Sequence, residues 1–386
     1  MAISILGALP LALAAVAQMP DSTPVIAPDS ASQRTASRPA VEVSGILFGN
    51  YQYRLNPGTG RVSNKFDLER AYITLRAPAG RNVSIRLTTD VFQQTRDDAD
   101  DYYKGWTIRA KYAYLQLHFL ERATAKGVVR FGLVHNVFID YDESYWPRWI
   151  STVPTDRHGY FSSADAGIAT LVTMPGKLGE VYATVTNGPG YTSRETDRFK
   201  DYAARITLTP FARVQKSLLQ SLAISAWTYR GAIGSRFAEG GPGQVGPVGE
   251  SLDRSRWGVF AAVRTPRAIV AAQYAAKADE GEAGDNTPAI PRTVTDSAGN
   301  LTSIYTILRP FAGRAGRAGS ISLVARGDRI SDHRDRRYRH DLFIGGMMLD
   351  LTSSASVSLD YQEQLPRYGS PASRSRIVFL HLVGRF

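Results

Sequence analysis

The chain has 386 residues and a formal net charge of +11, and 43% of its residues are hydrophobic. That hydrophobic share is too low for a bundle of membrane-spanning helices, whereas it suits a β-barrel, in which lipid-facing apolar residues alternate with polar residues of the lumen. The chain contains no cysteine, which excludes a disulfide framework, a thiol nucleophile and a cysteine-ligated metal. Eight of the 46 basic residues are lysine, and this excess of arginine has two readings: the codon usage of a GC-rich genome, or an anion-attracting surface or pore.

The N-terminal segment has the pattern of an export signal. Residues 2–17 are apolar and end in Ala15-Val16-Ala17, which matches the small residues that precede a signal-peptide cleavage site. The run is too short to span a bilayer, which takes about 20 residues. It departs from the usual pattern because no Lys or Arg precedes it. We expect residues 1–17 to be a signal peptide and residues 18–42, rich in Pro, Ser, Ala and Asp, to be a flexible periplasmic lead-in.

From residue 43 onward the sequence predicts strands and no helix. Its segments have roughly nine to twelve residues, the length of a tilted transmembrane strand. In one of them Ile85 and Leu87 fall on one face, and Arg86 and Asp90 on the other. Sixteen strands are predicted, with fourteen and eighteen as alternatives. Their spans are 43–54, 66–77, 82–93, 106–119, 126–135, 166–174, 179–187, 199–209, 220–230, 255–265, 267–278, 301–311, 319–329, 340–351, 354–364 and 374–386.

The connections distinguish a barrel from a soluble antiparallel sandwich, whose strands alternate equally well. Every second connection is short, as at 78–81, 175–178, 266 and 352–353. The intervening ones are longer: 55–65, 94–105, 136–165, 188–198, 231–254, 279–300, 330–339 and 365–373. Short periplasmic turns alternating with long external loops are typical of an outer-membrane barrel. Residues 43–386 are therefore predicted to form an all-β, transmembrane antiparallel β-barrel, with a soluble all-β binding protein as the alternative.

Strand parity directs the strand arginines toward the lumen. An Arg on the lipid face costs roughly 2–4 kcal/mol at mid-bilayer, which supports this orientation. The residues predicted to line the pore and select anions are Arg70, Arg76, Arg86, Arg130, Arg205, Arg264 and Arg326, together with Lys277. The lumen acids are fewer: Asp90, Asp328 and Asp360. For any single Arg, a salt bridge within the wall to Asp90 or Asp328 is the alternative role.

The last ten residues, IVFLHLVGRF, alternate up to the terminal Phe386. Leu380 and Leu382 share the lipid-facing parity, and His381 falls on the other face. A last strand that pairs with the first leaves no unpaired edge in lipid. We therefore expect this segment to close the barrel.

No pattern of catalytic residues stands out. The six histidines are scattered, and the sequence contains neither G-x-S-x-G nor H-E-x-x-H, so no enzyme, cofactor or metal site is predicted. Residues 329–340 form the densest charge run. The interleaved Asp332 and Asp335, and the position between two strands, favour an external loop near lipopolysaccharide phosphates over a nucleic-acid site.

Four stretches, in order along the chain, resemble bacterial porins. They are FDLERAYITLRAPAG from Phe66, VVRFGLVHNVF from Val128, TNGPG from Thr186 and LVARGDRI from Leu323. With the terminal strand, the likeness covers nearly all of residues 43–386. The chain is most similar to the phosphate-selective porin O and P family, from which it departs by using arginine where that family is rich in lysine.

This resemblance implies export through the periplasm to the bacterial outer membrane. Phe386 would be the signal for the barrel assembly machinery, and the protein would form a homotrimer in contact with lipid and lipopolysaccharide. The resemblance also implies that the loop 136–165 folds inward and narrows the lumen, with an outer lid or a trimer contact as alternatives. The charged candidates in this constriction loop are Asp140, Asp142, Glu143, Arg148, Arg157 and His158.

These features predict a water-filled pore for passive diffusion of small hydrophilic solutes, with a preference for anions such as phosphate. The alternative is a structural or adhesive barrel whose lumen is blocked by its loops. Conductance of the purified protein distinguishes the two.

Overall fold

The computed structural model describes residues 41–56, 63–93, 105–122, 124–195, 197–214, 218–234, 251–283, 293–314, 316–331, 339–367 and 374–386. The predicted signal peptide and the lead-in up to residue 40 lie outside the described residues. So do residues 332–338 of the charge run and parts of several predicted loops.

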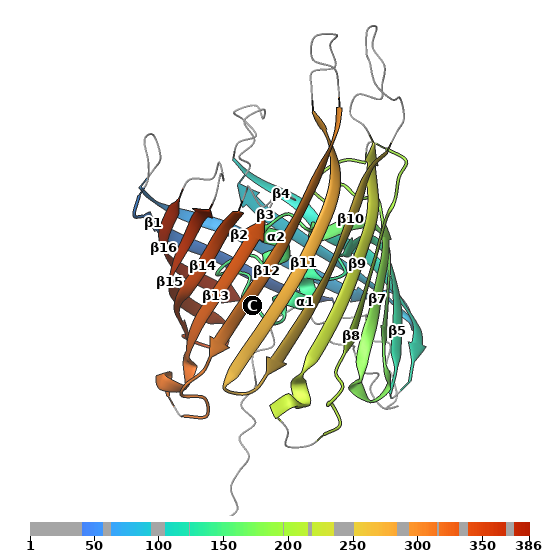
Figure 1. The fold of residues 1–386 in the computed structure, drawn as a ribbon. Coiled ribbons are helices and arrows are strands. Elements are labelled where there is room, and N and C mark those ends of the chain that lie inside the picture. Colours follow the sequence, from blue (N-terminus) through green and yellow to red (C-terminus); the bar gives the residue numbers. More distant parts are fainter. Residues whose placement is uncertain are drawn as a thin grey trace, which may run out of the picture.

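Sixteen strands form one closed antiparallel barrel (Figure 1). Each strand pairs with its neighbours in the sequence, and β1 pairs with β16. This confirms the predicted fold class and strand number. The strands are β1 (Glu42–Arg54), β2 (Asn64–Pro78), β3 (Val83–Gln93), β4 (Trp106–Glu121), β5 (Lys126–His135), β6 (Ala164–Thr173), β7 (Gly179–Thr186), β8 (Asp201–Leu208), β9 (Ala223–Gly234), β10 (Ser251–Arg264), β11 (Ala268–Ala283), β12 (Thr293–Leu308), β13 (Ile321–Ser331), β14 (Arg339–Asp350), β15 (Ala355–Arg367) and β16 (Ser375–Arg385).

The polarity of the barrel is the reverse of that in a soluble sheet protein. On β3, Arg86 is 5% exposed and Asp90 is 0% exposed, whereas Ile85 is 44% exposed. On β16, His381 is 2% exposed and Leu380 is 48% exposed. A continuous outer surface of apolar side chains requires hydrocarbon as its solvent, and the polar residues then gather in the lumen.

Two strands end just before a proline, at the end of the barrel where the short turns lie. Pro210 follows β8 and Pro310 follows β12, and each begins a Pro-Phe-Ala segment. Proline has no backbone N–H for the ladder, so the strands end there. The connections 209–222 and 309–320 are longer than the tight turns at 79–82, 265–267 and 351–354.

The hairpin of β11 and β12 extends further than predicted, because residues 279–300 were expected to be a loop. Pairing continues from Asp279 with Ser297 to Ala283 with Thr293. The segment is rich in Ala, Gly and acidic residues and lacks apolar alternation, so backbone hydrogen bonds, not side-chain pattern, define it. In Figure 1 this hairpin rises above its neighbours.

The barrel closes through the last residue of the chain. The Gly45 N–H donates to the Phe386 carbonyl at 3.0 Å, and the Phe386 N–H donates to the Gly45 carbonyl at 3.1 Å. The Phe386 ring occupies the space that a Cβ at position 45 would fill. Because Gly45 has no side chain, the Phe386 ring packs directly against its backbone.

Deletion of Phe386 should impair assembly. It removes both closing hydrogen bonds, each contributing about 0.5–1.5 kcal/mol, and the ring contact on Gly45. We expect a lower folded yield in outer-membrane fractions, measured by heat-modifiable electrophoretic mobility. Gly384→Ala is the control, because nothing lies within 4 Å of a Cβ there. A Phe386 deletion that assembles as well as Gly384→Ala would contradict this role.

Candidate functional site

The connection between β5 and β6 lies inside the barrel (Figure 1). It contains two short helices, α1 (Ile139–Glu143) and α2 (Pro154–Arg157), so the expectation of no helix was wrong here. The sequence signal for α2 was Pro154 at its first position, which suits a helix start. Within the described part of the chain, no helix is long and apolar enough to cross a bilayer.

Aromatic side chains hold this inward loop against the wall. Phe138 packs on Trp227 and Phe260, with ring centroids 5.8 and 5.6 Å apart. Trp146, which is fully buried, meets Tyr305 of β12 at 5.2 Å in an edge-to-face arrangement. Such ring pairs add about 0.5–1.5 kcal/mol each beyond simple burial.

Wall arginines bind the carbonyl groups of the loop. Arg205 of β8 donates to the Val137 carbonyl at 2.6 Å. Arg326 of β13 donates to the Thr152 carbonyl at 2.6 Å. Further donations of this kind run from Arg264 to the Ser144 carbonyl and from Arg256 to the Tyr160 carbonyl. Hydrogen bonds from a charged donor contribute about 1.5–3 kcal/mol, so these guanidinium groups fix the loop in place.

A buried carboxylate reinforces one of these contacts. Arg326 pairs with Asp328 at 2.6 Å, and His158 of the loop approaches the same carboxylate at 3.0 Å. Arg326 therefore has the wall salt bridge that was its alternative role. Burial lowers the pKa of His158, while its hydrogen bond to the Asp328 carboxylate opposes this shift.

Asp142 anchors the loop to the opposite wall and does not face an opening. Its side chain is fully buried and accepts hydrogen bonds from Tyr305 of β12 and from Gln273 of β11, the latter at 2.9 Å. Burial raises the pKa of Asp142 to about 6, although both hydrogen bonds act to lower it. The buried Oε1 of Gln273 has no hydrogen-bond partner among the described residues.

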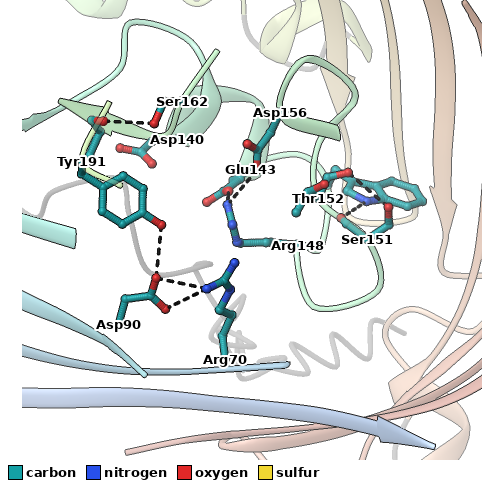
Figure 2. A network of polar contacts seen from close by, with 12 residues as sticks. Arg70, Asp90, Asp140, Glu143, Arg148, Ser151, Thr152, Asp156, Ser162 and Tyr191 are labelled. Carbon is teal, nitrogen blue, oxygen red and sulfur yellow. Dashed lines mark hydrogen bonds and ion pairs between the residues drawn. The ribbon is translucent and has the colours of Figure 1, made fainter. Parts of the chain in front are cut away.

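The loop carries a second charged cluster that faces the wall of β2 and β3 (Figure 2). Arg148 pairs with Glu143 and lies 3.4 Å from Asp156. Burial acts to lower the pKa of Arg148, but these two carboxylates overcome that effect and raise it well above its usual value. A gap separates this cluster from the wall, and on the wall side Arg70 of β2 pairs with Asp90 of β3 at 3.2 Å. This pair is again the alternative wall salt bridge.

Asp90 has further partners. Arg109 of β4 pairs with it at 3.0 Å, and the Tyr191 hydroxyl donates to it at 3.1 Å. Arg109 also stacks over the Phe92 ring, 3.7 Å from its centroid. The acids on both sides of the gap are thus held by neighbouring cations.

Lys111 is a cation at this gap that strand parity misses. Thr88 pairs with Tyr112 and Thr89 with Ala110, so Lys111 is the extra residue of a β-bulge and turns inward. Its residue is 2% exposed, and its ammonium lies 4.4 Å from the Tyr72 ring centroid. Among the described residues, no carboxylate lies within ion-pair distance of Lys111. The bulge offers no clear signal in the sequence.

Three further predicted pore residues, Arg86, Arg130 and Arg76, lie nearer the end of the lumen at which the tight turns connect the strands. Arg86 contacts His135 and lies 4.8 Å from the Tyr112 ring centroid. Arg130 donates to Gln116 at 2.8 Å. Arg76 pairs with Glu42 at 3.6 Å. Asp140 of the loop accepts from the Tyr112 hydroxyl and pairs with His135, so it joins the loop to this cluster.

Over the described ranges, no three His, Cys, Asp or Glu side chains gather in a way that would hold a metal ion.

Comparison with known proteins relates this architecture to porins. No protein-family model and no curated protein sequence matches the chain. An anion-selective porin from Comamonas acidovorans superposes with a TM-score of 0.60 at 10% identity, covering 90% of this chain and 100% of that chain. OmpF of Salmonella typhi in complex with daunomycin gives 0.57 at 12% identity, covering 90% and 97%. OmpT of Vibrio cholerae in its trimer form gives 0.56 at 12%, covering 91% and 100%. The chain therefore has the sixteen-strand fold of bacterial outer-membrane porins.

Stability should depend on the ionisation of Asp142. Its folded-state pKa lies above the unfolded value, so its contribution is greatest below about pH 4 and is lost as pH rises through about 6. The difference amounts to about 3 kcal/mol. We expect Asp142→Asn to match the parent protein at pH 4 and to be more stable at pH 7.5 by up to this amount. Urea unfolding in detergent micelles measures the difference, and a gap that does not change with pH would contradict the assignment.

Proposed function

We propose that the protein is a porin of the bacterial outer membrane, a passive water-filled channel for small hydrophilic solutes that prefers anions. The shared fold, the apolar outer face and the polar lumen support a channel in that membrane. Spaces of about 330 and 300 Å³ remain beside the inward loop, which supports an open lumen.

The group of cations on the wall beside Asp90, which are Arg70, Arg109 and Lys111, is the observation that carries the anion preference. Asp90 faces Arg70 and Arg109, whereas Lys111 has no carboxylate partner in the described chain. A narrow opening with low-dielectric walls focuses such a charge and raises the local concentration of anions. Phosphate is the anion that the porin O and P resemblance adds to this proposal. The anion-selective Comamonas porin has the same fold.

Assembly is also part of the proposal. The trimer form of Vibrio OmpT supports a homotrimer for this chain. The exposed Phe386 ring suits recognition by the barrel assembly machinery, and the arginine-rich sequence of residues 329–340 suits lipopolysaccharide phosphates.

A structural barrel with a closed lumen is the second candidate. The dense anchoring of the loop by Arg205, Arg264 and Arg326 favours it, because a loop so fixed does not swing aside.

Planar-bilayer conductance distinguishes the two candidates. We expect steady single-channel current and a reversal potential, under a KCl gradient, that favours chloride over potassium. Adding phosphate should then reduce the chloride current if both anions share the gap. The absence of open-channel current would establish the closed barrel instead, and a cation-favouring potential would contradict the anion preference.

Lys111→Gln should weaken the anion preference, because it removes the cation without an acid partner. We expect the anion-to-cation permeability ratio to fall by about threefold, the effect of one charge acting across a partly hydrated gap. Lys177→Gln, at the turn between β6 and β7, is the control. Combined replacement of Arg70, Arg86 and Arg130 by Ala should lower the ratio further. Equal permeability ratios in Lys111→Gln and the control would show that Lys111 does not contribute to the anion preference.

A further inference from the structure

A cavity of about 330 Å³ lies between the inward loop and the wall formed by β1, β2 and β14 to β16. Its lining includes Glu69 of β2 and Arg157 of α2. It also includes the amides of Gln52 and Gln362 and the hydroxyl of Ser151. The cavity belongs to the external half of the lumen, because β1 runs outward to Arg54, which also lines it.

Glu69 reaches this cavity through a second β-bulge. Gly49 pairs with Leu68 and Phe48 pairs with Arg70, so Glu69 is the unpaired extra residue of β2. Its carboxylate accepts one long hydrogen bond, from the Asn50 amide at 3.5 Å. In the described part of the chain it forms no ion pair.

Arg157 provides the opposite charge from the loop. Its Nη1 donates to Ser151 at 2.8 Å and approaches Gln362 at 3.5 Å. Burial, followed by the charge of Arg326, lowers the pKa of Arg157 to about 10, so the guanidinium remains charged at neutral pH. No carboxylate of the described residues lies within ion-pair distance of it.

The cavity therefore holds, between the wall and the loop, one carboxylate and one guanidinium that form no ion pair among the described residues. Of the other charged groups in the lining, Asp67 pairs with Lys65 at 2.6 Å and His381 lies 3.1 Å from Asp360. Arg54, at the outer end of β1, donates to Ser375 at 3.4 Å and forms no ion pair among the described residues. An anion or a cation alone would satisfy one of the two open charges and repel the other. A solute that carries both charges satisfies both.

We infer that this cavity is a binding subsite for zwitterionic α-amino acids, with the ammonium group at Glu69 and the carboxylate at Arg157. The side-chain amides and hydroxyl of the lining supply further hydrogen bonds. The inference rests on the proposed porin only for the route by which the solute enters. It adds a second class of solute to the anions attracted by Lys111.

Three ligands of matched size test this assignment: L-alanine, L-lactate and L-alaninamide. L-Lactate lacks the ammonium group, and L-alaninamide lacks the carboxylate. Binding to the full-length protein in detergent micelles is measured by saturation-transfer NMR. All variants are measured in the Lys111→Gln background, so that lactate does not also bind at the gap. We expect L-alanine to bind about tenfold more tightly than either analogue, the effect of one charge-assisted contact.

Two variants then give a crossed pattern. Glu69→Gln should reduce L-alanine affinity about tenfold to that of L-lactate, since only the carboxylate is still recognised. Arg157→Gln should reduce it to that of L-alaninamide. Glu195→Gln and Arg314→Gln are controls, because these residues do not line the cavity.

Equal affinity of the parent protein for all three ligands would overturn the assignment, as would an equal loss of all three in either variant. This binding measurement does not depend on conductance. A protein without channel current that still shows the crossed pattern would refute the proposed channel and leave the subsite intact.

Discussion

The pairing of every strand edge is the constraint on which the rest of this structure depends. Hydrocarbon offers no partner for a backbone N–H or carbonyl group, so a sheet in a bilayer has to close on itself. Here closure falls to β1 and β16, which pair along their length from Ile46 with Arg385 to Arg54 with Ile377. Closure also creates an inner face, and the polar side chains of alternate positions gather there.

The inward loop contacts that inner face through both apolar and polar groups. Guanidinium groups of the wall donate hydrogen bonds to the backbone carbonyls of the loop. Aromatic rings from β9, β10 and β12 pack against the apolar side chains of the loop. The loop thus has both an apolar and a polar anchor. One cavity remains toward β1, β2 and β14 to β16, and another toward β5 and β7 to β10. The charges of Figure 2 lie on the side of β2 and β3.

Two β-bulges decide which charges reach this space. Each inserts one residue into a ladder and reverses the parity of the residues beyond it. The bulge of β2 brings in Glu69, and the bulge of β4 brings in Lys111. Without them, parity would turn Lys111 toward lipid, where a charge is costly. The bulges thus place one acid and one base in the lumen close to the loop.

The sequence by itself determined the barrel, its strand number and the inward direction of the arginines, because alternation with period two is a local property that each strand displays on its own. The terminal strand and its partner followed from the same alternation and from the need to close. What the arginines do was decided by tertiary structure: Arg326 binds Asp328 and a loop carbonyl, whereas Arg70 binds Asp90 of the neighbouring strand. The short helices of the loop, the long β11–β12 hairpin and the two bulges also arose only in three dimensions. They depend on backbone register and on contacts between residues far apart in the chain, which a local pattern of polarity does not encode.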